Sequence, residues 1–108
     1  MNVGDAERRL LSDTEENDGT FSKLRSGIDP GETDVQRLIS ALRILHHANR
    51  EGHFLPRDIT RAAATILHFR FEAEGNLRDS KSPIRPELVN ELSDLSQAAF
   101  NLLVDEQL

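Results

Sequence analysis

The chain of 108 residues contains no cysteine, no tryptophan and no tyrosine. Without cysteine it forms no disulfide, no thiolate metal site and no thiol nucleophile. No apolar run approaches the roughly 18 residues that a membrane-spanning helix needs, and the first residues, MNVGDAERRLL, lack the apolar core of a secretory signal. We therefore expect a cytoplasmic protein that does not bind membranes.

Positive charge is also scarce, because the formal net charge is −6. Residues 1–34 and 87–108 are acidic, and the last of these segments carries no base at all. Residues 35–86 are basic, but their arginines are scattered along the segment. An acidic chain repels a phosphate backbone, so this distribution argues against direct binding of nucleic acid.

Strand signals are missing, whereas helical periodicity is persistent from residue 29 onward. A first helix is expected over 34–51, with Thr33 as N-cap and Gly52 as the stop. Its apolar residues recur in steps of three and four. They are Val35, Leu38, Leu42 and Leu45.

A second helix is expected over 56–74, beginning at Pro56 and ending at Gly75. Its apolar arc is wider than one neighbouring helix would cover. A third helix is expected over 86–106, where leucines and an alanine form a heptad seam at Leu88, Leu92, Leu95, Ala99 and Leu102.

The sequence therefore predicts an all-α fold of three main helices in a small dimeric bundle, spanning residues 29–108. Residues 1–28 mix acids with Ser, Thr, Asn and Gly and show no sustained period. We expect this segment to be a weakly structured acidic N-terminal arm, pinned onto the bundle by a few apolar side chains. The candidates for that role are Leu10, Leu11, Phe21 and Leu24.

Three of the four histidines lie within LHHANREGHF, which raises the question of a metal site. His46 and His47 are adjacent, so their side chains leave a helix about 100° apart and cannot face one ion together. His53 lies beyond Gly52, and His47 with Glu51 is an incomplete ligand set. No serine lies in a nucleophile elbow and no glycine-rich loop could cradle a phosphate. We expect no metal, no cofactor and no enzymatic activity.

Binding to another protein is the function class that remains. Three helices in a chain of this size cannot cover all the apolar side chains of the second and third helices, and a sizeable exposed apolar patch marks an interface. The residues expected to bind a partner or a second copy of the chain are Ile44, Phe69, Phe71, Phe100 and Leu103.

A short, acidic, cysteine-free helical chain carrying DVQRLISALRILHHANREGHFLPRDITRAAATILHFRF resembles the QslA-type quorum-sensing anti-activators of Pseudomonas. The resemblance lies in overall character and includes no diagnostic motif, so it assigns no binding residue. It implies a helical homodimer that binds the ligand-binding domain of a LuxR-type transcription factor. Such binding would block the dimerisation of that factor and so keep it from DNA.

Two alternatives stay open. Arg57 and Arg61 follow a short turn and could face phosphates in a small protein resembling a helix-turn-helix, although the net charge and the acidic third helix oppose this. An antitoxin or a secretion chaperone would share the protein-interaction class, and only its partner would distinguish it.

Overall fold

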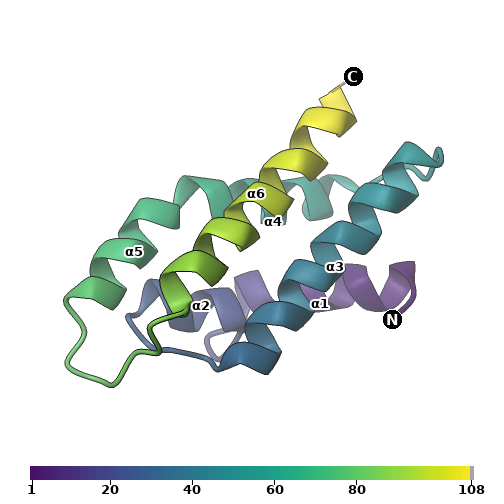
Figure 1. The fold of residues 1–108 in the computed structure, drawn as a ribbon. Coiled ribbons are helices and arrows are strands. Elements are labelled where there is room, and N and C mark those ends of the chain that lie inside the picture. The colour runs from purple at the N-terminus through teal and green to yellow at the C-terminus, as the bar shows by residue number, and fades with distance from the viewer. Residues whose placement is uncertain (108) are drawn as a thin grey trace.

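The computed structural model describes residues 1–107, with side chains through Asp105, and contains helices and no strand within this range. The all-α prediction is confirmed (Figure 1). Residues 1–107 contain six helices where the sequence predicted three. They are α1 (Val3–Glu15), α2 (Thr20–Arg25), α3 (Glu32–Arg50), α4 (Arg57–His68), α5 (Arg70–Arg78) and α6 (Leu88–Gln107).

The centre of the fold is the pair α3 and α6, which lie side by side and run in the same direction (Figure 1). Three leucines of α3 are fully buried, as are Leu88, Leu95 and Leu102 of α6. The expected bounds of α3 hold to within two residues, and Gly52 has the positive φ of 94° that was predicted for its stop. The N-cap is Gly31 rather than Thr33, because the chain turns into the helix through a positive φ at Gly31.

The prediction of one helix over 56–74 is wrong. The helix ends at His68 and a second one, α5, begins at Arg70, with Phe69 between them at φ −101° and ψ 9°. Gly75 lies inside α5 and stops nothing. The break lets α5 pack on α2 while α4 packs on α6 and α1, so tertiary packing overrides the local helical pattern.

The prediction of a weakly structured N-terminal arm is also wrong. Asn2 and Asp5 form a capping box, in which each side chain accepts a hydrogen bond from the backbone N–H of the other, and this box starts α1. Leu10, Phe21 and Leu24 are fully buried in the same core as α3 and α6. Apolar burial therefore holds α1 and α2 in place, although residues 1–34 are acidic overall.

A buried carboxylate joins the two N-terminal helices. Asp13 accepts a hydrogen bond from Arg9 Nε at 2.8 Å and one from the backbone N–H of Thr20, which starts α2, at 3.3 Å. Burial raises the pKa of Asp13, and the hydrogen bond from Thr20 and the charge of Arg9 only partly offset that effect.

Candidate interaction surface

The side of α6 that faces away from α3 and α4 carries exposed apolar side chains. Val89 is 59% exposed, Phe100 is 51% exposed and Val104 is 37% exposed, while the leucines of the opposite side are buried. Val89 and Phe100 are eleven residues apart, which is three helical turns and about 16 Å along the axis. Together with the exposed Ser93 between them, they form one face, which we call the outer stripe: Val89, Ser93, Phe100 and Val104.

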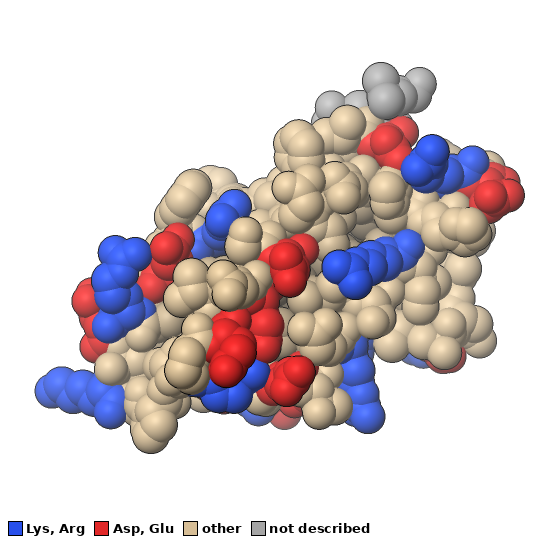
Figure 2. Space-filling view, in the orientation of Figure 1, with Lys and Arg blue, Asp and Glu red and all other residues tan. Residues whose placement is uncertain are grey.

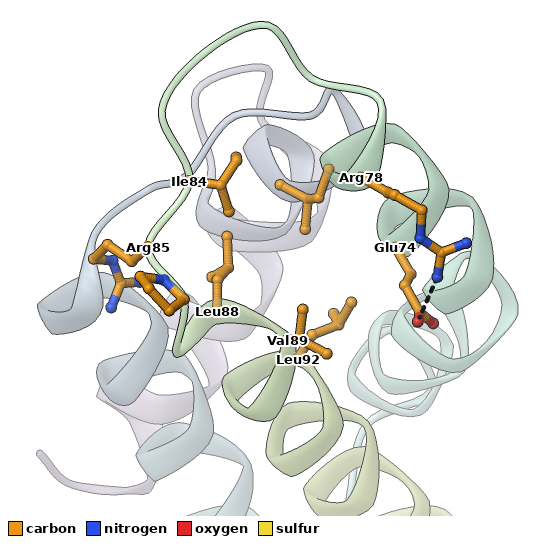
Figure 3. Close-up of a pocket in the computed structure, with 9 residues that line it drawn as sticks. Glu74, Arg78, Ile84, Arg85, Leu88, Val89 and Leu92 are labelled. Atoms are coloured by element: carbon orange, nitrogen blue, oxygen red, sulfur yellow. Dashed lines mark hydrogen bonds and ion pairs between the residues drawn. The ribbon is translucent and has the colours of Figure 1, made fainter.

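An apolar groove opens beside the beginning of the outer stripe, between α5 and α6 (Figure 3). It has a volume of about 320 Å³, which is enough for one or two large side chains and small for a drug-sized ligand. Glu74 and Arg78 of α5 form an ion pair of 3.2 Å at its edge. The apolar lining consists of Leu77, Ile84, Pro86, Leu88, Val89 and Leu92.

The loop that precedes α6 is fixed by one arginine. Arg85 donates to Asp29 from Nε at 2.9 Å and from Nη2 at 3.0 Å, and to Glu91 from Nη2 at 2.7 Å. The Arg85 backbone N–H also donates to Asp29, at 3.0 Å. These bonds tie the loop before α3 to the first turns of α6, so the wall of the groove is held in place.

The same cluster shifts the acidity of its members. Burial alone would raise the pKa of Asp29, but the hydrogen bonds from Arg85 and from the Gly31 N–H outweigh it, and the pKa is lowered. Hydrogen bonds to Glu91 and then to Asp29 raise the pKa of Arg85, which stays charged at any pH of interest. The cluster is therefore an ionic link of the fold wherever Asp29 is ionised.

The flank of the outer stripe that faces α3 is acidic. Asp94 follows Ser93 and lines a shallow pocket with Arg43 and His46 of α3. Figure 2 shows acidic side chains over α6 and basic ones over the neighbouring α3. Nearer the end of α6, Asp105 pairs with His46 and lies 3.8 Å from Arg50 Nε. Between Leu88 and Gln107, α6 carries no base at all.

The structure places the five sequence-predicted residues in two groups. Phe71, on α5, is 74% exposed and Phe100 is half exposed. Ile44, Phe69 and Leu103 are partly buried and pack against the core. The Phe69 ring is covered by the guanidinium of Arg25 in α2, at 3.6 Å from the ring centroid.

Five exposed apolar residues were not among the binding residues expected from the sequence. They are Met1, Ile28, Phe54, Val89 and Val104. The spacing of eleven between Val89 and Phe100 is the signal that could have found the outer stripe. Phe54 is 85% exposed, but it lies alone in the connection between α3 and α4.

The histidines form no metal centre in the part of the chain that the structure describes, which holds no group of three metal-ligating side chains. His46 is engaged by Asp105, whereas His47, His53 and His68 are exposed. None of the helices described is long and apolar enough to cross a bilayer. No protein-family model, no curated protein and no solved structure matches the chain.

Proposed function

We propose that this chain is a protein-interaction regulator that binds its partner through the outer stripe of α6. The observation that carries the proposal is the exposure of Val89, Phe100 and Val104 along one face of a single helix. Exposed apolar residues scattered singly are normal on a protein surface, but several on one face of a helix beside an apolar groove are typical of an interface. Phe54 illustrates the first case and the outer stripe the second.

The setting of the stripe supports the proposal. The leucines on the other side of α6 are buried in the core, and the loop before the helix is held by Arg85. A surface on a rigid element loses little conformational entropy when a partner binds, so more of the contact energy appears as affinity. The adjacent groove offers a pocket for an anchoring side chain, the feature that concentrates binding energy in interfaces.

The specific form that we propose is an anti-activator. In this form the chain sequesters a LuxR-type quorum-sensing transcription factor and blocks its dimerisation and DNA binding, as the resemblance implies. Subunit interfaces resemble a divided core, so a protein that occupies one needs an apolar surface of its own. The homodimer expected for this chain stays a prediction, to be measured by sedimentation at micromolar concentration.

Calorimetric titration of the chain against the ligand-binding domain of a LuxR-type factor tests the proposal. Phe100→Ala should weaken binding about thirtyfold, since truncating an interface anchor costs about 2 kcal/mol. Phe54→Ala is the matched control and should bind normally, as should Arg57→Ala. The chain could instead bind DNA in the absence of the factor, with an affinity that falls steeply with salt and depends on Arg57 and Arg61. That result would contradict the proposal and support a nucleic-acid-binding protein.

A further inference from the structure

The surroundings of the outer stripe restrict the kind of partner that fits it. We infer that the stripe receives an amphipathic α-helix whose apolar seam is flanked by lysine or arginine. This inference rests on the proposed function and deepens it by naming the shape and charge of the partner segment.

The shape of the surface favours a helix. The stripe runs from Val89 to Val104, a length of about 22 Å at 1.5 Å per residue, which matches a partner helix of about 15 residues. Ser93 is small and exposed between the larger Val89 and Phe100. A small side chain at this position would let a leucine-sized side chain of a second helix approach the backbone of α6, in the manner of a knob between four residues of its neighbour.

The groove between α5 and α6 lies at one end of the stripe. Its lining from α5, the preceding loop and α6 is apolar, and the Glu74 to Arg78 ion pair lies at the edge rather than inside (Figure 3). An apolar side chain of the partner could therefore enter it without burying an unpaired charge. Anchors for the groove and for Phe100 would lie about three turns apart on the partner helix, which repeats the spacing of the stripe itself.

The charge beside the stripe decides between a basic and an acidic helix. The acids on α6 include Glu91 and Asp105, and both are engaged by cations of this chain. Asp94 and Glu87 are exposed, and neither forms an ion pair with another side chain in the described part of the chain. Arg43 of α3 also lines the pocket beside Asp94, so an acidic helix would meet two acids and one base on this flank. A partner helix with lysine or arginine would instead pair with Asp94 and Glu87.

A second copy of α6 fits less well. It offers an apolar seam but no base between Leu88 and Gln107, so Asp94 and Glu87 of each copy would face acids or amides. Like charges opposed across an interface act against the wrong partner. The partner segment is therefore a basic helix of another protein.

Two synthetic helical peptides of 18 residues test the inference, one built from leucine and lysine and the other from leucine and glutamate, each with leucine along one face. Binding of each labelled peptide to the full chain is measured by fluorescence anisotropy. The lysine peptide should bind at least about tenfold more tightly than the glutamate peptide. Asp94→Lys should reverse or abolish that preference, and Phe100→Ala should weaken the lysine peptide about tenfold or more.

Matched variants separate a site from general attraction to an acidic protein. Asp18→Lys changes the net charge as much as Asp94→Lys but lies in the turn between α1 and α2, and Phe54→Ala removes a ring that is more exposed than Phe100 and lies far from α6 along the chain. Both should leave peptide binding unchanged. Equal binding of the two peptides, no binding of either, or equal losses in Asp18→Lys and Asp94→Lys would overturn the inference. The proposed function would survive such a result if a folded partner still required Phe100.

Discussion

The two ends of the chain differ in how completely their apolar side chains are buried. The N-terminal helices α1 and α2 are polar and rich in charged residues of both signs, yet Leu10, Phe21 and Leu24 are completely buried. Helix α6 contains many more apolar residues and leaves Val89 and Phe100 half exposed or more. Burial therefore follows from what packs over a residue and not from the apolar content of its own segment.

This difference explains which of the expected interface residues remain open. A bundle of three helices leaves apolar surface on α3, α4 and α5, but α1 packs on α3 and α4 while α2 packs on α5. Phe69 is the clearest case, since Arg25 of α2 covers its ring. Helices α1 and α2 thus occupy part of the surface that the sequence analysis assigned to a partner, and Phe71 of α5 and the outer stripe of α6 are left exposed.

The largest expected effect tests whether the N-terminal helices belong to the core. Phe21→Ala should lower the free energy of unfolding by about 3 to 4 kcal/mol, because it empties a fully buried aromatic site in α2. Urea denaturation followed by circular dichroism measures it. Phe54→Ala, at an 85% exposed ring, should change stability by less than about 0.5 kcal/mol. Similar values for the two variants would show that α2 does not pack as described.

A smaller loss is expected at the start of α6. Arg85→Ala should cost about 2 kcal/mol, because it leaves the carboxylates of Asp29 and Glu91, both more than nine-tenths buried, without their cation. Arg78→Ala is the control, since its pair with Glu74 is mostly exposed on the arginine side and is worth at most about 0.5 kcal/mol. If the two variants unfold at the same urea concentration, Arg85 does not hold the loop before α6.

The pH dependence that Asp13 gives to stability should be opposite in sign to that of a paired surface carboxylate. Its pKa is raised above the ordinary 3.8, so in the window just above that value the folded chain keeps a proton that the unfolded chain releases. The contribution of Asp13 to the free energy of unfolding therefore falls as pH rises through this window. Asp13→Asn cannot titrate and should lose that slope.

Urea denaturation of both proteins between pH 3 and pH 6 measures the effect. The stability of Asp13→Asn relative to the original chain should increase with pH, and a decrease would mean that Arg9 and Thr20 outweigh burial. Asp29 titrates in the other direction, because its lowered pKa stabilises the fold above its range and is lost on acidification. The difference between the two proteins cancels that contribution.

The sequence predicts where the helices lie better than it predicts which of their apolar side chains are buried. The period of three and four in α3 and α6 located both helices to within about two residues, since a long amphipathic stripe is a strong signal. The N-terminal helices have short apolar stripes. The start of α1 depends on the Asn2 and Asp5 capping box, which is a weak signal in the sequence. The break at Phe69 has no local signal, because it depends on where α2 and α6 lie. Phe71 and Phe100 could be predicted as exposed from the sequence. The groove could not, because it depends on the path of the loop over residues 79–87.

The smallest change in stability is expected for Phe100→Ala. Phe100→Ala should alter the free energy of unfolding by less than about 1 kcal/mol, because half of the ring is already in water and its removal opens no closed cavity. The same variant should weaken partner binding about thirtyfold, the reverse of what Phe21→Ala does to a folded population. Urea denaturation and calorimetric titration of one preparation measure both quantities. A large loss of stability with normal binding in the remaining folded fraction would place Phe100 in the core and remove it from the interface.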